Sequence, residues 1–367
     1  MTEATQRTSD SGVSIWLDDL SRTRIESGNL QELIAEKNVV GVTTNPSIFQ
    51  KALSQVGPYD AQLKELGKVD VDTAIRELTT TDVRNATDIF REIAEKTDFV
   101  DGRVSIEVDP RLAHDTEGTE KQAVELWEKV NRPNAMIKIP ATLEGLPAIT
   151  ATLAKGISVN VTLIFSLERY EQVIDAFIEG IAQADANGHD LKHIGSVASF
   201  FVSRVDTAVD KQLEEIGTDE AKALEGKAAI ANARIAYELF EKKFAEDPRW
   251  AALEAKGAKK QRPLWASTGT KNPNYSDCVY VDELVAPFVV NTMPEKTLNA
   301  LADHGNGAPT IQGTYEESHA VMDKLAELGI DFKAVTDKLE ADGVSQFINS
   351  WDSVIADVQA GIDRVNG

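Results

Sequence analysis

The chain has 367 residues, 42% of them hydrophobic, and its 38 basic and 60 acidic side chains give a net charge of −22 at pH 7. This charge argues against nucleic acid and anionic membranes as partners, although a local cluster of cations can still bind a small anionic substrate. We expect no signal peptide and no membrane span, and the single cysteine, Cys278, excludes an internal disulfide, so we expect a cytoplasmic protein.

Segments with strand and helix patterns alternate along the chain. The first dozen residues are polar, and we expect them to be disordered. From there the apolar patterns predict eight strands, at 14–18, 39–45, 103–109, 135–140, 158–164, 193–199, 263–267 and 287–291. Helical segments separate the strands: Pro46 opens one, Ser166 is the expected N-cap of another that ends near 186, and a long helical stretch covers 201–246.

Eight strands separated by helices predict an α/β protein with a (β/α)₈ barrel. A doubly wound open sheet is the structural alternative, but the glycine-rich dinucleotide fingerprint typical of such sheets is absent. After the alternation ends, we expect a helix at 316–328 and two helical segments that begin near Phe332 and Val344. We therefore predict one domain over residues 1–367, with the barrel at 13–303 and a helical extension at 304–367 packed on it.

The most informative segment is the predicted strand 135–140, which contains a lysine. Apolar residues at 135, 137 and 139 form one face of the strand, so Lys138 points to the other face. If that face is enclosed, desolvation favours the neutral amine, which is a nucleophile for carbonyl groups. The alternative is a half-buried lysine that reaches solvent or pairs with a carboxylate.

Polar residues gather on the face that Lys138 shares. In the first, third and fifth strands the apolar side chains take one parity, which would face the helices. The opposite parity and the strand ends carry Asp18, Asn45, Glu107, Lys138, Asn160, Thr162 and Ser199. In a barrel these side chains converge on the C-terminal mouth, the usual catalytic face, and burying so many polar groups is costly unless they form a site. A polar layer satisfied by its own hydrogen bonds is the alternative.

The residue types favour carbonyl chemistry. Lys138 can attack a ketone to form a carbinolamine and then a Schiff base, which draws electrons from the adjacent carbon–carbon bond. Asp18 is the candidate base for the cleavage, and Glu107 can exchange protons through a water that Thr162 orients. Two amides can hold substrate hydroxyls without carrying charge, Asn45 and Asn160. Asn45 precedes a proline, and its alternative role is to cap a helix.

Cations for an anionic substrate follow the sixth and seventh strands. Arg204 can bind phosphate as a planar fork, and Ser199 can add a hydroxyl. Lys271 lies in the loop after the seventh strand, a region where barrels often bind phosphate. The alternatives are an ion pair of Arg204 with Asp206 or Asp210 and a solvated Lys271.

The ordered set of these segments resembles the transaldolase family. The matching segments are 16–18, 43–47, 105–109, 137–140, 160–165, 199–204 and 266–267 with Lys271. The resemblance implies a Schiff-base (β/α)₈ barrel that uses no cofactor and no metal. It also implies the transfer of a dihydroxyacetone unit from sedoheptulose 7-phosphate or fructose 6-phosphate to glyceraldehyde 3-phosphate or erythrose 4-phosphate, in the pentose phosphate pathway.

The resemblance further implies a role for each matching position. Lys138 is similar to the Schiff-base lysine and Asp18 to the general acid/base, while Glu107 and Thr162 would manage the catalytic water. The substrate-binding roles fall on Asn45, Asn160, Ser199, Phe201, Arg204 and Lys271. Where many relatives have an arginine after the seventh strand, this chain has Lys271. The resemblance implies sugar phosphates as partners, assigns no catalytic role to 304–367, and leaves a homo-oligomer open.

Two other functions share part of this pattern. A Schiff-base fructose-6-phosphate aldolase would use the same lysine but release the three-carbon unit to water. A non-catalytic sugar-phosphate-binding barrel would have no use for an enclosed lysine. Metal-dependent aldolase chemistry is disfavoured, because none of the five histidines forms a convincing ligand cluster in the sequence.

Overall fold

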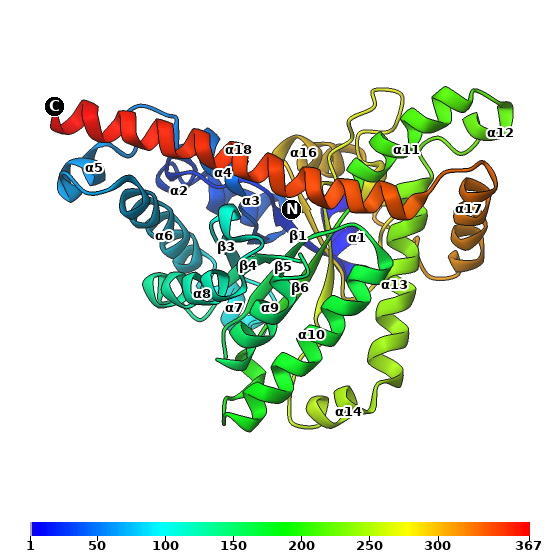
Figure 1. The fold of residues 1–367 in the computed structure, drawn as a ribbon, viewed down its shortest axis with the longest axis horizontal. Helices are drawn as coiled ribbons and strands as arrows, with labels where there is room; N and C mark the ends of the chain where they lie inside the picture. The colour runs from blue at the N-terminus through cyan, green and yellow to red at the C-terminus, as the bar shows by residue number, and fades with distance from the viewer. Residues whose placement is uncertain (1) are drawn as a thin grey trace.

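The fold is a closed barrel of parallel strands surrounded by helices (Figure 1). The computed structural model describes residues 2–367, and within them eight strands pair in sequence order, with β8 closing on β1. The strands are β1 (Ser14–Leu17), β2 (Val39–Val42), β3 (Arg103–Glu107), β4 (Ala135–Pro140), β5 (Val159–Ile164), β6 (Ser196–Phe201), β7 (Arg262–Ala266) and β8 (Val290–Met293). The predicted (β/α)₈ barrel is confirmed.

Helices connect the strands and cover the outside of the barrel. As far as β4 they are α1 (Glu3–Asp10), α2 (Arg22–Glu26), α3 (Asn29–Lys37), α4 (Pro46–Leu53), α5 (Asp60–Leu66), α6 (Val71–Ile89), α7 (Arg91–Lys96), the 3₁₀ helix η1 (Pro110–Leu112) and α8 (Thr116–Val130). From β4 to β8 they are α9 (Gly145–Ala154), α10 (Leu167–Ala186), η2 (Leu191–His193), α11 (Ser203–Ile216), α12 (Asp219–Lys222), α13 (Ala228–Glu246), α14 (Pro248–Glu254) and α15 (Val279–Asp282). After β8 come α16 (Glu295–His304), α17 (Tyr315–Glu327) and α18 (Phe332–Asn366).

The sequence located most of these elements, and the errors have local causes. The predicted strand at 287–291 was too early, because Phe288 adopts a positive φ of 66° and turns the chain before β8 begins at Val290. The single helical stretch expected at 201–246 is three helices, because Gly217 and Gly226 both take left-handed backbone conformations. Residues 3–10 form α1 instead of a disordered segment, and α1 packs against α16 and β1.

The N-terminal end of the barrel is closed by buried arginines and a tryptophan. Arg103 donates to Phe99 O and Pro133 O, and Arg262 donates to Ser14 Oγ and Val289 O, so both buried guanidinium groups are satisfied by protein oxygens. Trp16 lies so close to Gly41 that a Cβ there would approach the indole to 2.5 Å, which only glycine avoids. This end serves stability, and the opposite end is free for chemistry.

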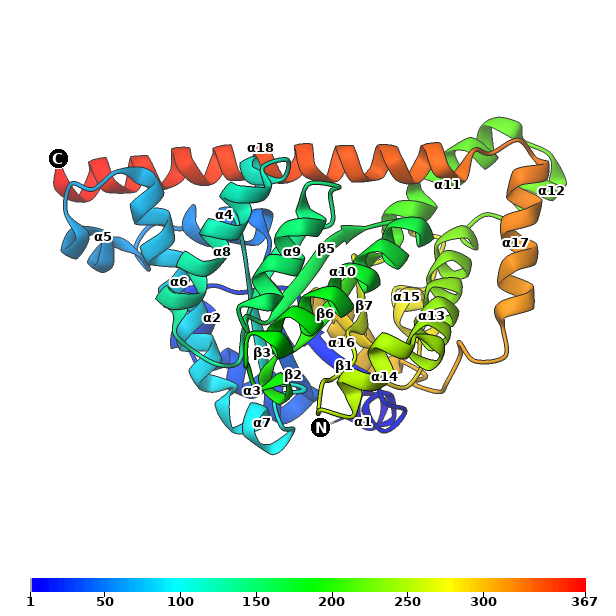
Figure 2. The same cartoon turned by 60° about the horizontal axis from the view of Figure 1, so that its bottom comes forward.

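The longest helix, α18, crosses the C-terminal end of the barrel. Two helical segments were expected in its place, but the helix continues without a break from Phe332 to Asn366. It contacts α4, η1 and α11, which begin at the C-terminal ends of β2, β3 and β6. Figure 2 shows it lying across the ends toward which the strands point. The last helix of the chain therefore covers the mouth of the barrel.

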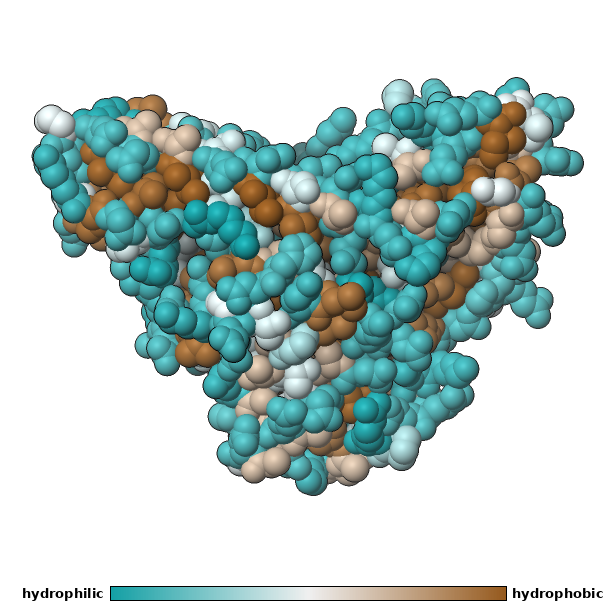
Figure 3. All heavy atoms as spheres, in the orientation of Figure 1, coloured by the Kyte–Doolittle hydropathy of each residue, from teal (hydrophilic) through white to brown (hydrophobic). Residues whose placement is uncertain are grey.

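The outer surface is mainly polar. The face in Figure 3 is mostly hydrophilic, and the apolar residues visible there form separate patches. The large exposed apolar side chains are scattered, four of them in connecting segments and Ile216 at the end of α11: Val56, Val100, Leu143, Ile216 and Phe288. None of the helices in residues 2–367 combines the length and the apolar character that a membrane crossing requires.

Candidate active site

Three neighbouring strands bring the central polar groups together. Glu107 on β3 pairs in register with Lys138 on β4, and Lys138 pairs with Asn160 on β5. Residues in register on parallel strands point to the same face, so all three side chains enter the barrel, as their parity predicted. The chain thus places a carboxylate, an amine and an amide side by side.

Lys138 lies on the floor of the site and is 4% exposed. Its Nζ donates to the carbonyl oxygen of Thr44 at 2.9 Å and lies 3.5 Å from Oε2 of Glu107. A lysine amine enclosed in this way is placed to attack the carbonyl group of a substrate in the site.

Glu107 is suited to move protons near neutral pH. Burial raises the pKa of its carboxyl to about 7, and the charge of Lys138 opposes that rise. Within the described residues neither carboxylate oxygen accepts a hydrogen bond from a protein donor. The residue also borders a cavity of about 280 Å³ that Trp351 of α18 helps to line, which is room for ordered water. A proton donor and acceptor beside the amine is what imine formation requires.

Asp18 lies just after β1 and is held by a neighbouring hydroxyl. Thr43 Oγ1 donates to Asp18 Oδ1 at 2.7 Å and contacts Thr292 Oγ1 at 2.5 Å. Burial raises the pKa of the Asp18 carboxyl, and Lys138 and the hydrogen bond from Thr43 oppose that rise. A carboxyl group oriented in this way can accept a proton from a substrate hydroxyl.

Asn160 and Ser199 belong to a hydrogen-bonded layer below the mouth. Asn160 donates to Ser105 Oγ at 3.0 Å and accepts a hydrogen bond from Ser199 Oγ at 2.7 Å. The predicted alternative of a satisfied polar layer therefore describes this pair in part. Thr162 is fully buried on β5, and its hydroxyl has no partner among the described residues.

These groups open onto a cavity of about 180 Å³ at the C-terminal mouth. Its lining includes Asp18, Thr43, Asn45, Ser47, Lys138, Ser199, Phe201, Arg204, Ala266, Ser267, Gly269, Lys271, Thr292, Pro294 and Phe347. Glu107, Asn160 and Thr162 lie outside this lining, although Glu107 and Asn160 are in register with Lys138. Asn45 borders the cavity and also caps α4, because its side chain accepts a hydrogen bond from the backbone N–H of Ile48.

Arg204 supplies the positive charge at the mouth. Its guanidinium lies 5.4 Å from the centre of the Phe201 ring, and no carboxylate of the described residues forms an ion pair with it. The predicted alternative was wrong: Asp206 accepts from Tyr280 and Asp210 from Tyr275. Burial lowers the pKa of Arg204, so an anion in the cavity would relieve the desolvation of this cation.

Several cavity residues were missed by sequence reasoning. Thr43 donates to Asp18 and contacts Thr292. The polar end of the second predicted strand was a signal for Thr43, and Thr292 had none. Ser267 lines the cavity beside Lys271, takes a positive φ of 54° and contacts Ser203 Oγ at 2.9 Å. Phe347 comes from α18, and its apolar helical pattern carries no signal of a site.

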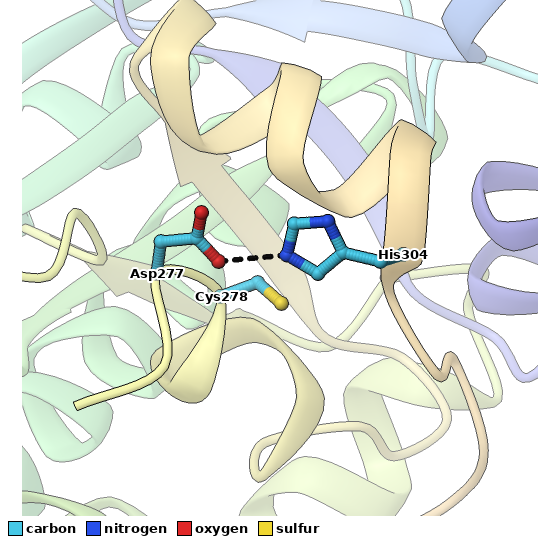
Figure 4. Close-up of side chains that lie close together, drawn as sticks. All are labelled: Asp277, Cys278 and His304. Atoms are coloured by element: carbon cyan, nitrogen blue, oxygen red, sulfur yellow. Dashed lines mark hydrogen bonds and ion pairs between the residues drawn. The ribbon is translucent and has the colours of Figure 1, made fainter.

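One group of potential metal ligands lies elsewhere. The possible ligand atoms of three residues lie within 4.8 Å of one another: Asp277, Cys278 and His304 (Figure 4). The sequence did not indicate that His304 lies beside the other two. His304 Nε2 and Asp277 Oδ1 are 2.8 Å apart, so they already satisfy each other. Burial raises the pKa of the Cys278 thiol to about 11, which disfavours the thiolate that binds metals. The group shares no residue with the cavity around Lys138.

Comparisons with known proteins agree with this architecture. A family model described as transaldolase/fructose-6-phosphate aldolase matches residues 15–358. A transaldolase of Mycolicibacterium smegmatis is 60% identical over 97% of this chain and 96% of its own length. A transaldolase of Arthrobacter sp. is 58% identical over 99% of this chain and 98% of its own. A transaldolase of Mycobacterium tuberculosis is 58% identical over 97% of this chain and 96% of its own.

Proposed function

The chain belongs to the transaldolase/fructose-6-phosphate aldolase family, and on that premise we propose a transaldolase whose Schiff base forms on Lys138. It transfers a dihydroxyacetone unit from a ketose phosphate to an aldose phosphate, the reaction of the pentose phosphate pathway. The observation that carries the proposal is the buried amine of Lys138, 3.5 Å from the Glu107 carboxylate and open to a cavity that also contains Asp18 and Arg204.

The proposed reaction begins with imine formation. The amine of Lys138 attacks the ketone carbon of the donor to give a carbinolamine. Glu107 then protonates the departing hydroxyl, directly or through a water near Thr162, and one water leaves as the Schiff base forms. A carboxyl group with a pKa of about 7 can give this proton and later take it back at neutral pH.

Cleavage and transfer follow from the position of Asp18. Its carboxylate takes the proton from the hydroxyl on the far carbon of the breaking bond, and the electrons of that carbon–carbon bond move toward the iminium nitrogen. The aldose phosphate leaves, and the three-carbon unit remains on Lys138 as an enamine. The enamine carbon then attacks the aldehyde of the acceptor, and Asp18 returns the proton to the new hydroxyl. Water then hydrolyses the new Schiff base, which releases the ketose phosphate and frees the amine of Lys138.

The remaining residues would hold the sugar phosphate. Asn45 borders the cavity and Asn160 lies in register with Lys138, so both are proposed for the hydroxyls of the three-carbon part. Arg204 is proposed as the main phosphate ligand, because it is a half-buried cation without a carboxylate partner. Lys271 is exposed at the rim and is proposed as a weaker second ligand. The hydroxyl of Ser199 is engaged with Asn160, so its proposed contact with phosphate requires that bond to rearrange.

A trapping experiment tests whether Lys138 is the nucleophile. The protein is incubated with fructose 6-phosphate and borohydride, and the reduced adduct is mapped by mass spectrometry. We expect the adduct on Lys138 and none in Lys138→Ala. An adduct on Lys271, the other lysine in the cavity lining, would contradict the mechanism.

The same experiment on Asp18→Asn separates imine formation from cleavage. The amide keeps the size of the side chain but cannot accept the proton, so the adduct should accumulate while turnover stops. Asp19→Asn is the matched control, because Asp19 binds Arg24 at 2.7 Å and lies outside the lining of the Lys138 cavity. Near wild-type turnover in Asp18→Asn would assign the base elsewhere.

A further inference from the structure

One wall of the cavity around Lys138 comes from outside the barrel. Most of its lining lies on the strands or in the segments that follow them, whereas Phe347 belongs to α18. Its side chain is 3% exposed and therefore is not part of the outer surface of the helix. The last helix of the chain thus places one large apolar ring above groups that are otherwise mostly polar.

The contacts of α18 hold this ring at the mouth. One turn before Phe347, a Cβ on Gly343 would lie 3.0 Å from the Leu163 side chain and 3.7 Å from Nη1 of Arg204, so the helix backbone sits directly on the rim. Three residues after it, Ser350 Oγ lies 2.9 Å from Ser47 Oγ, the second residue of α4.

A third contact fixes the start of this stretch. Glu340 forms an ion pair with Arg169 at 2.8 Å, and Arg169 also donates to the carbonyl oxygen of Ala141, just after β4. The segment of α18 that carries Phe347 is therefore anchored to the β4 end of the barrel on one side and to α4 on the other. Its position over the cavity is built into the fold.

The reaction contains a step at which water matters. After cleavage the enamine on Lys138 has two fates. It can attack the aldehyde of an acceptor, or it can take a proton at carbon to become an iminium. Water then adds to the iminium carbon, the carbon–nitrogen bond breaks, and the nitrogen takes up the proton, which releases dihydroxyacetone and the free amine. Excluding water from a site suppresses such hydrolysis of a reactive intermediate.

We propose that Phe347 is a positioning residue that limits water over the three-carbon intermediate and so favours transfer over release. This inference rests on the proposed function. An apolar ring leaves a neighbouring water without a hydrogen-bond partner on that side, so it lowers the water content of the mouth. The ring touches no reacting group in the proposal; it acts through the solvent that the cavity can hold.

The test compares two rates in the full-length protein. One is the release of dihydroxyacetone from fructose 6-phosphate alone, and the other is transfer to erythrose 4-phosphate or glyceraldehyde 3-phosphate. Phe347→Ala should raise the ratio of release to transfer by at least about tenfold, the change that corresponds to about 1.4 kcal/mol in the difference between the two barriers. Phe347→Leu keeps an apolar side chain and should hold the ratio near the wild-type value.

Two controls separate this effect from loosening of the helix. Val354→Ala removes a fully buried side chain of the same helix that does not line the cavity, and it should leave the ratio unchanged. Borohydride trapping on Lys138 in each variant reports whether the Schiff base forms. An adduct with an unchanged ratio in Phe347→Ala, or an equal rise in Val354→Ala, overturns this inference alone. Absence of an adduct in the wild-type protein overturns the proposed function itself.

Discussion

At the scale of single residues, the site depends on groups whose ordinary ionisation is opposed by burial. Lys138 and Glu107 are both nearly inaccessible to solvent, and their 3.5 Å separation is too long for a tight ion pair. Burial raises the pKa of the Glu107 carboxyl to about 7, so the protonated form that the proposed reaction needs is populated near neutral pH. Arg204 differs because a guanidinium keeps its charge, so its desolvation is relieved only by an anion.

This view of Arg204 predicts a selective defect. Losing a buried, charge-assisted contact by truncation costs about 2–5 kcal/mol, so Arg204→Ala should lower kcat/KM for a phosphorylated ketose by roughly 30-fold or more. A ketose without phosphate lacks this contact and should lose much less. Steady-state kinetics with both substrates measure the difference.

Lys271→Ala is the comparison for that experiment. Lysine is a flexible point charge, and Lys271 is exposed at the rim, so the same selectivity should appear but more weakly. Equal losses for the phosphorylated and the free sugar in Arg204→Ala would mean that Arg204 supports the fold or the acid/base groups.

At the scale of elements, α18 decides how open the mouth is. The helix remains continuous through Gly343, a residue with low helix propensity. The absence of a side chain there lets the helix approach Leu163, whose own φ of 60° is rare for a leucine. The glycine is thus explained by packing on the barrel rim, since it costs the helix some stability.

A larger side chain at this glycine should lift the helix. Gly343→Leu forces a side chain into the space of Leu163 and Arg204, and overpacking of this kind costs about 1–3 kcal/mol. We expect both lower stability and lower turnover. Thermal unfolding and the transfer assay measure the two effects.

A second glycine of α18 gives the matched comparison. A Cβ on Gly361 would lie 2.9 Å from Leu63 of α5, far along the helix from the cavity. Gly361→Leu should therefore destabilise the protein to a similar degree while turnover of the folded fraction is retained. If both variants lose turnover equally, the docking of α18 as a whole, and not its contact with the rim, controls activity.

At the scale of the whole molecule, the two ends of the barrel differ in how many hydrogen-bond partners these buried side chains have. At the N-terminal end, carbonyl and hydroxyl oxygens satisfy the donors of Arg103 and Arg262, and Arg262 also forms an ion pair with Asp101 at 3.1 Å. At the C-terminal end, the oxygens of Glu107 and the hydroxyl of Thr162 have no hydrogen-bond partner among the described residues, and Glu107 has only the 3.5 Å ion pair with Lys138. Unsatisfied groups lower stability and are retained where they serve chemistry.

The stability of the whole protein should report this arrangement through pH. Burial raises the pKa of Glu107 from 4.5 to about 7, so between these values the folded state binds the proton more tightly than the unfolded chain. The contribution of Glu107 to the free energy of unfolding is therefore largest at low pH and is lost as pH rises through this window, by about 1.4 kcal/mol for each pKa unit.

Replacing the carboxyl group removes this dependence. Glu107→Gln should gain stability relative to the wild-type protein as pH rises from about 4.5 to about 7 and should show no further gain above that window. Urea denaturation of both proteins across this pH window measures the difference between their free energies of unfolding. The titration of the other carboxylates contributes equally to both proteins and cancels in this difference. Parallel stability curves would show that Glu107 titrates normally in the folded protein.

The sequence by itself determined the barrel and the inward direction of Glu107, Lys138 and Asn160. Strand parity is a local property, because successive side chains alternate between the two faces whatever the rest of the chain does. Local signals also located caps: Ser166 is the N-cap of α10 and Asn45 that of α4, and each side chain accepts a backbone hydrogen bond.

Only the tertiary structure decided what surrounds those side chains. The support of Asp18 by Thr43 and Thr292 joins three strands, and the presence of Phe347 in the cavity depends on where α18 docks. An apolar residue on a helix predicts burial but not the partner that buries it, because the hydrophobic effect is non-directional. For that reason the sequence could not predict that α18 covers the cavity around Lys138.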